Sequence, residues 1–241
     1  MMIKSRAIVL SSMKFGESKI IVDMFTEQVG RVSFICRIAK TAKGKIKKQY
    51  FQPLSILDME FDYRMNSKLQ YIKDVRIAEP FASIPFDSFK LAISFFISEF
   101  LYYSTCEEQQ NKQLFRYIVN SVLWLDAAQH DFYSFHLVFM MHLSLFLGLL
   151  PNTDNYQEGD FFDLRDGRFV AIVPLHSDYL SSSESSLIQT LLRLNYETMN
   201  LCKLSHIERN RCAEVLLYYY RLHIPNFQIL KSFDVLKTLF S

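Results

Sequence analysis

The stretch LDMEFDY, residues 57–63, alternates apolar and acidic side chains along its whole length. Its odd-numbered residues are apolar or aromatic and its even-numbered residues are acidic. Side chains of an extended strand point alternately to its two sides, so a period of two places one face in a core and the other in water. The stretch therefore predicts a strand with one buried face.

Four similar runs, rich in β-branched and aromatic residues, lie on both sides of this strand at residues 5–11, 19–25, 31–38 and 69–77. The turn-prone stretches Phe15-Gly16-Glu17, Val29-Gly30 and Met65-Asn66-Ser67 separate them. Five short strands within about 80 residues predict a small closed barrel. An OB-fold and an SH3-like barrel would have nearly the same pattern.

The pattern becomes helical after Pro80 and Pro85. Apolar stripes predict helices over 91–103, 114–125 and 132–150. Two capping boxes, Ser181 with Glu184 and Ser205 with Glu208, predict helices that run to about residues 195 and 222. Ser232 is predicted to cap a last helix through residue 240. The polar segment 152–173 contains Asp166-Gly167 and predicts a loop or β-hairpin insertion. The expected class is α+β, with a barrel domain over 1–80 and a helical domain over 81–241.

One apolar stretch of the sequence is nearly long enough to cross a membrane. Residues 132–150 carry no formal charge and approach the length of a membrane span. The polar side chains of His136, His142 and Ser144 within it favour a helix buried in a water-soluble domain instead. No membrane contact is therefore expected. The four cysteines form no C-x-x-C pair, which fits a reduced, intracellular setting.

The residue types that carry catalysis or metal binding do not occur at the spacings they need. The six glycines are too scattered for a phosphate-binding loop, and no two histidines stand three or four residues apart. The paired carboxylates are interpreted as solvated faces: Glu107-Glu108, Asp160 with Asp163, and the acids at 58, 60 and 62. We expect no catalytic residue, no metal, no cofactor and no enzymatic activity.

The charge balance of the chain changes near residue 80, where the hydrophobic pattern changes from strand-like to helical. Residues 1–80 hold 15 Lys and Arg against 8 Asp and Glu, whereas residues 81–241 hold 12 against 17. Within the first part, the segment from Arg31 to Lys48 contains seven cations and no acid. Such a segment attracts polyanions, because phosphates bound to it release counterions. A solvated loop with no dedicated ligand would carry the same charge pattern.

Aromatic residues accompany this basic segment. Proteins that bind single strands join a cationic groove to aromatic rings on which bases stack, and Phe34 stands between basic neighbours. Most rings of a small barrel fill its core instead. The predicted contacts to DNA are Arg31, Phe34, Arg37, Lys40, Lys43, Lys45, Lys47 and Lys48.

Short motifs along nearly the whole chain resemble the RecO family of bacterial recombination mediators. Phe15-Gly16-Glu17-Ser18 and residues 25–31 (FTEQVGR) are similar to the opening of that family's OB barrel, and Phe51-Gln52-Pro53-Leu54 to a strand entry. The later matches are residues 147–152 (LGLLPN), 162–169 (FDLRDGRF), 220–223 (YRLH) and 230–237 (LKSFDVLK). The motifs are individually short, but they occur in the family's order.

The resemblance implies an N-terminal OB-fold, a C-terminal helical domain and no catalytic site. It also implies binding to single- and double-stranded DNA, annealing of complementary strands, and help in loading recombinase onto strands covered by single-stranded-DNA-binding protein. RecR and the tail of that binding protein would be partners, in the cytoplasm at the nucleoid. Many members carry a four-cysteine zinc site after the motif at 147–152; residues 152–167 here contain no cysteine, so no zinc is expected.

Two other functions remain open from the residues alone. A basic loop of this kind could contact an acidic protein surface in an interaction scaffold. An OB barrel could equally bind RNA.

Overall fold

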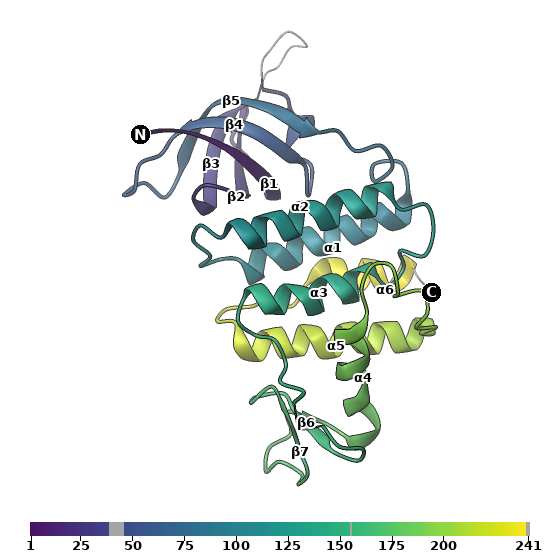
Figure 1. The fold of residues 1–241 in the computed structure, drawn as a ribbon. Coiled ribbons are helices and arrows are strands. Elements are labelled where there is room, and N and C mark those ends of the chain that lie inside the picture. Colours follow the sequence, from purple (N-terminus) through teal and green to yellow (C-terminus); the bar gives the residue numbers. More distant parts are fainter. Residues whose placement is uncertain (39–45, 155, 240–241) are drawn as a thin grey trace. The chain divides into compact units, whose positions relative to one another are not determined.

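The computed structural model describes residues 1–38, 46–154 and 156–239, and it begins with a closed five-stranded barrel (Figure 1). The strand order is β1-β2-β3-β5-β4, closed by antiparallel pairing of β1 with β4. The strands are β1 (Met2–Phe15), β2 (Lys19–Thr26), β3 (Gly30–Arg37), β4 (Ile56–Asp62) and β5 (Gln70–Glu79). A parallel pairing of β3 with β5 completes the OB-fold, which the sequence predicted together with the SH3-like alternative.

The barrel core contains the side chains that alternate inward along each strand. Phe34 on β3 meets Phe61 on β4 edge to face, with ring centroids 4.9 Å apart. Both rings are fully buried, as the period of two at residues 57–63 requires for Phe61. The acids on the outer face of β4 are not simply solvated, because each pairs with a cation on a neighbouring strand. Those pairs are Asp58 with Arg76, Glu60 with Lys4, and Asp62 with Lys73.

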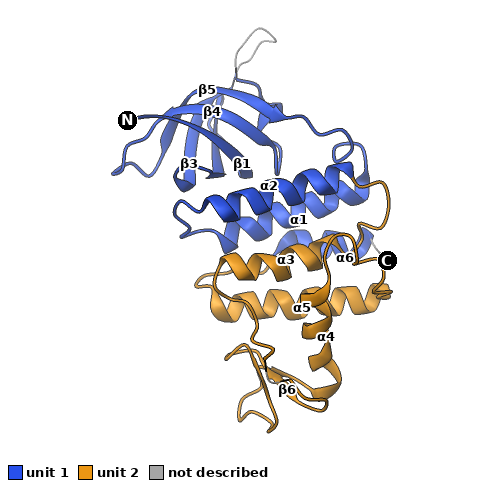
Figure 2. Cartoon of the chain, in the orientation of Figure 1, with its two compact units in different colours: residues 1–127, 230–239 blue, residues 128–229, 240–241 orange. Residues whose placement is uncertain are grey.

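Three helices pack with the barrel into one compact unit, unit 1, which comprises residues 1–127 and 230–239 (Figure 2). They are α1 (Ser88–Ser104), α2 (Lys112–Ala127) and α6 (Lys231–Leu239). Asp87 caps α1 by accepting from the backbone N–H groups of Phe89 and Lys90. Because these helices cover the barrel, the boundary expected at residue 80 lies inside unit 1.

Helix α6 packs on α1 although more than a hundred residues separate them in the sequence. Phe233 meets Phe96 with centroids 5.8 Å apart. The Glu99 carboxylate accepts from the backbone N–H groups of Lys231 and Ser232, at 3.2 and 2.8 Å, and from the Ser232 hydroxyl. The sequence interpretation of Ser232 as an N-cap is therefore wrong: Ser232 lies inside the helix, and a carboxylate from α1 supplies the capping acceptor.

Unit 2, described over residues 128–229, contains the other helices and a small sheet (Figure 2). Its elements are α3 (Phe135–Phe146), β6 (Phe161–Asp163), β7 (Arg168–Val170), β8 (Tyr179–Leu180), α4 (Ser182–Arg193) and α5 (His206–His223). The capping box of Ser205 and Glu208 is present at the start of α5, as predicted. That of Ser181 and Glu184 is not: the Ser181 side chain makes no capping bond, and the Glu184 carboxylate binds Arg211 at 2.8 Å.

Helix α3 is the uncharged segment that suggested a possible membrane span. It is shorter than predicted: it begins at Phe135, and the positive φ angle of Gly148, 71°, stops it after Phe146. Its side chains are mostly buried within the protein. In residues 1–38, 46–154 and 156–239, none of the helices has the length and hydropathy that a membrane crossing needs.

Candidate nucleic-acid interface

The outer face of β2 and β3 is the surface that OB-folds use for oligonucleotides. In this chain, helices of unit 1 cover the half of that face nearest the β2–β3 turn. The Phe25 ring on β2 packs against Phe115 of α2 at 6.3 Å. On the neighbouring strand, the Ser98 hydroxyl of α1 donates to the carbonyl of Leu10. Helices α1 and α2 therefore cover part of this half of the face, although Asp23, Arg31 and Ser33 still line a pocket of about 340 Å³ beside Tyr102.

Arg31, a predicted DNA contact, belongs to the covered half. Its guanidinium lies 3.6 Å from the Asp23 carboxylate and 4.5 Å from the centre of the Tyr102 ring. Only 11% of its side chain is exposed, and this burial lowers the pKa of Arg31 against the opposing effect of Asp23. Arg31 therefore joins the barrel to α1. It was expected to be an exposed contact for phosphate instead.

Phe34 was predicted to be exposed as a ring for base stacking, but the structure buries it. Its exposed fraction is 0%, so no base can stack on it in this structure. The physical reason is the alternation of β3. Arg31 and Arg37 occupy outward positions, whereas Phe34 is an odd number of residues from each and points into the core.

The other half of the face, away from that turn, is open. Here three outward residues align across neighbouring strands: Phe15 pairs with Lys19, and Lys19 pairs with Arg37. All three are exposed, and Phe15 keeps 52% of its surface. Tyr71, 65% exposed, pairs with Ile35 at the β3–β5 contact. We call the exposed residues of this half the distal face: Met13, Phe15, Lys19, Arg37 and Tyr71.

Several cations elsewhere on the barrel are paired with acids, whereas the two cations of the distal face are not. The cations Lys4, Lys73 and Arg76 on β1 and β5 are each matched by a carboxylate within 3.1 Å. Within the described part of the chain, Lys19 and Arg37 have no acidic partner. Uncompensated cations beside exposed rings are the combination that binds the backbone and bases of a single strand.

The remaining predicted contacts follow β3 along the chain. Arg37 ends that strand on the distal face. Lys40, Lys43 and Lys45 lie outside the described residues. Lys47 and Lys48 are at the start of the short helix η1 (Lys48–Phe51), where Lys48 is exposed. The structure thus brings Arg37 to the same surface as Lys19 and separates both from Arg31 and Phe34.

Phe15 was missed because a β-bulge changes the alternation of β1. Ala7 and Val9 point into the core, and an unbroken period of two would also turn Phe15 inward. The pairing with β2 shifts between Val9 and Ser11, so the residues beyond it are turned to the opposite faces. The register of the tight β1–β2 turn, counted back from Gly16, is the sequence signal that would have identified Phe15.

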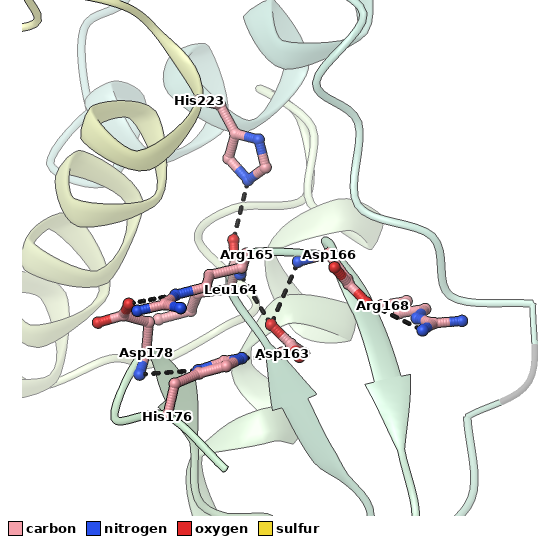
Figure 3. A network of polar contacts seen from close by, with 8 residues as sticks. All are labelled: Asp163, Leu164, Arg165, Asp166, Arg168, His176, Asp178 and His223. Atoms are coloured by element: carbon pink, nitrogen blue, oxygen red, sulfur yellow. Dashed lines mark hydrogen bonds and ion pairs between the residues drawn. The ribbon is translucent and has the colours of Figure 1, made fainter. Parts of the chain in front are cut away.

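The insertion of unit 2, where zinc was not expected, is held by hydrogen bonds and ion pairs (Figure 3). The Asp163 carboxylate accepts from the N–H groups of Arg165 and Asp166 at 2.8 and 3.2 Å and lies 3.2 Å from His176 Nε2. The Asp178 carboxylate accepts from Arg165 Nε at 2.6 Å and from the Tyr218 hydroxyl. Asp160 and Asp163 are buried, so the interpretation of this pair as solvated was wrong.

The described residues contain neither a cluster of metal ligands nor a cysteine with a lowered pKa. No group of three or more His, Cys, Asp or Glu side chains there could hold a metal ion. Burial raises the pKa of Cys36 to about 12 and that of Cys212 to about 11. A thiol with so high a pKa is a poor nucleophile at neutral pH.

The barrel and its distal face define the class of this chain: an OB-fold protein with a helical extension. Residues 1–81 match the family model described as "Recombination protein O N terminal", and residues 85–232 match "Recombination protein O C terminal". The chain belongs to the RecO family of DNA repair proteins. Proteins named "DNA repair protein RecO" from Bacteroides fragilis and Phocaeicola vulgatus are each 46% identical to it over 241 residues, covering all of both chains. The one from Porphyromonas gingivalis is 32% identical over 247 residues, again covering both chains completely.

Proposed function

We propose that this chain is a non-enzymatic DNA-binding mediator of recombinational repair. It binds and anneals single strands, binds duplex DNA, and helps load recombinase onto strands covered by single-stranded-DNA-binding protein. The observation that carries the proposal is the distal face, on which exposed rings lie beside the cations Lys19 and Arg37, unpaired in the described part of the chain.

Cations and aromatic rings would have different roles in binding. Lys19, Arg37 and the lysines from 40 to 48 would neutralise phosphates, which supplies affinity without sequence preference. Phe15 and Tyr71 would stack on bases of a single strand, whose π faces are accessible. Stacking occupies the face of a base and leaves its Watson–Crick edge available, as pairing with a second strand requires.

The partners proposed for this work are RecR and the C-terminal tail of the single-stranded-DNA-binding protein. They are proposed from membership of the family. The place of work is the cytoplasm, at the nucleoid.

Binding of the full chain to a single strand, a duplex and an RNA strand of matched sequence tests the DNA-binding function. We expect Phe15→Ala and Tyr71→Ala each to weaken single-strand binding by about tenfold, as loss of one stacked base does. The dependence of affinity on salt should stay unchanged, because no phosphate contact is removed. Phe86→Ala is the matched control, since Phe86 is 85% exposed but lies outside the distal face.

The alternatives predict different outcomes. An RNA-binding protein would bind the RNA strand more tightly than the matched DNA strand at every salt concentration. An interaction scaffold would show no measurable affinity for any of the three at about 0.15 M salt. Faster pairing of complementary labelled strands in the presence of the wild-type chain is the expected sign of annealing.

A further inference from the structure

Unit 1 contains a cleft of about 660 Å³ that the distal face does not include. One wall is β1 around its bulge, at Leu10, Ser11 and Ser12. A second is η1 with the residues after it, from Lys48 to Pro53, and a third is α1. Ser232 of α6 lies at the end nearest Glu99. Sites for small organic ligands are typically of about 300–1,000 Å³, so a nucleotide would fit.

The α1 wall of the cleft is aromatic. Phe95, Tyr102 and Tyr103 face it from positions about two turns of the helix apart, because residues seven and eight apart lie on one side. Phe95 is 46% exposed although it lies mid-helix. Tyr102 and Tyr103 meet edge to face at 5.0 Å, and the Arg31 guanidinium covers a face of Tyr102. Phe95 therefore offers the more open ring for stacking.

The other walls bring polar groups that both donate and accept hydrogen bonds. These are the hydroxyls of Ser11 and Ser12 and the amide of Gln52. Glu99 is the only acid that lines the cleft among the described residues. Its carboxylate already accepts from two N–H groups and one hydroxyl at the start of α6. The cleft thus combines one aromatic wall with neutral hydrogen-bonding groups, which is the chemistry of a site for a planar heterocycle.

Lys48, which lines the cleft, also belongs to the basic segment of the sequence. It is the last of the seven cations between Arg31 and Lys48, and its side chain is exposed. Lys48 would therefore neutralise the phosphate next to a base held in the cleft. An acidic peptide would fit less well, because this single lysine is the only cation that lines the cleft among the described residues and a carboxylate lies on the opposite wall.

We propose that this cleft binds one unpaired nucleobase of a single strand, stacked on Phe95, with the adjoining phosphate at Lys48. The inference rests on the proposed DNA-binding function and adds a second contact, in a cleft, to the open distal face. A base inside a duplex is already stacked and paired, so the cleft would select single strands over duplex.

The test measures binding of the full-length protein to a thymidine oligonucleotide that carries one fluorescent purine, and to a duplex of the same length. Phe95→Ala should weaken single-strand binding by about tenfold and leave duplex binding and the salt dependence unchanged. It should also abolish the change in purine fluorescence that the wild type produces. Phe95→Tyr, which keeps the ring, should retain both. Phe86→Ala is the control for truncating an exposed phenylalanine of the same unit.

The remaining outcomes separate failure of the cleft proposal from failure of the proposed function. If the wild type binds single strands and a folded Phe95→Ala variant binds them equally well, the cleft is not a base site, although the proposed function stands. Equal losses on single strand and duplex would likewise overturn the inference. An acidic peptide with a terminal aromatic residue that binds the wild type but not Phe95→Ala, with DNA affinity unaffected, would assign the cleft to a protein partner. Failure of the wild type to bind any DNA would contradict the proposed function itself.

Discussion

At the scale of single residues, Gly30 shows how closely the barrel approaches the α1–α2 connection. Its φ angle is +76°, a conformation that other residues adopt only with strain. A Cβ at this position would lie 2.4 Å from the backbone carbonyl of Gln109. The next residue, Arg31, donates its N–H to the carbonyl of Glu108 at 3.0 Å. Two segments of backbone therefore meet here with no room for a methyl group.

Gly30→Ala should lower the free energy of unfolding by about 2–4 kcal/mol, since backbone strain and overpacking both act there. Gly16→Ala is the matched control: its φ angle is +69°, but no atom lies within 4 Å of its Cβ position. We expect about 1–2 kcal/mol for the control, from strain alone. Urea unfolding of both variants measures the difference. Equal losses of stability would show that the close approach to Gln109 does not matter.

His136 of α3 gives the stability of unit 2 a defined pH dependence. Burial, with a contribution from the charge of Arg209, lowers the pKa of His136 to about 3. In the unfolded chain its pKa is about 6.5. Between these two values the unfolded chain binds a proton that the folded chain does not, so stability falls as the pH is lowered through this window.

His136→Gln removes the titrating group and keeps an amide in its place. Between pH 7 and pH 5, the wild type should lose about 2 kcal/mol more of its free energy of unfolding than the variant does. Denaturant unfolding at the two pH values measures this difference. The same loss in both proteins would contradict the lowered pKa.

At the scale of the elements, local signals were the reliable part of the sequence. The period of two at residues 57–63 predicted β4, and the spacing of Ser205 and Glu208 predicted the start of α5; both are confirmed. These features depend on neighbours a few residues away. The residues of the nucleic-acid interface could not be predicted from such patterns. Phe15 is exposed by the bulge after Val9, and Arg31 is covered by Tyr102 of α1.

Distant side chains also replaced predicted local contacts. Glu184 binds Arg211 instead of closing a capping box, and Glu99 caps α6 in place of Ser232. Contacts between distant residues also join the barrel to α1, α2 and α6 in unit 1.

The insertion between α3 and α4 leads to a prediction about metal content. Its β6–β7 turn is already tied by the Asp163 carboxylate, and Gly167 in it approaches the Tyr219 hydroxyl too closely for a Cβ. We expect the purified protein to hold no stoichiometric zinc and to unfold at the same temperature with and without a chelator. Elemental analysis after dialysis measures the zinc content. A value of about one zinc ion per chain would require a different explanation of this segment.

At the scale of the whole molecule, the charges are divided between the barrel and the helices. Residues 1–80 carry the excess of cations, and residues 81–241 the excess of acids. Ion pairs neutralise the cations Lys4, Lys73 and Arg76 of the barrel, whereas Lys19 and Arg37 of the distal face have no acidic partner among the described residues. We therefore expect phosphates of bound DNA at the distal face and along the acid-free sequence that follows Arg37.

The most direct test is the salt dependence of single-strand binding by the full chain when Lys43, Lys45, Lys47 and Lys48 are all changed to Ala. The variant should bind more weakly, and its plot of log K against log salt should be flatter by about 0.7 for each phosphate that the protein no longer neutralises. A control changes four exposed cations of helices to Ala: Lys112, Arg116, Arg193 and Arg221. This control should keep the wild-type slope. An unchanged slope in the folded lysine variant, with a flatter slope in the control, would place DNA on the helices and contradict binding by the barrel.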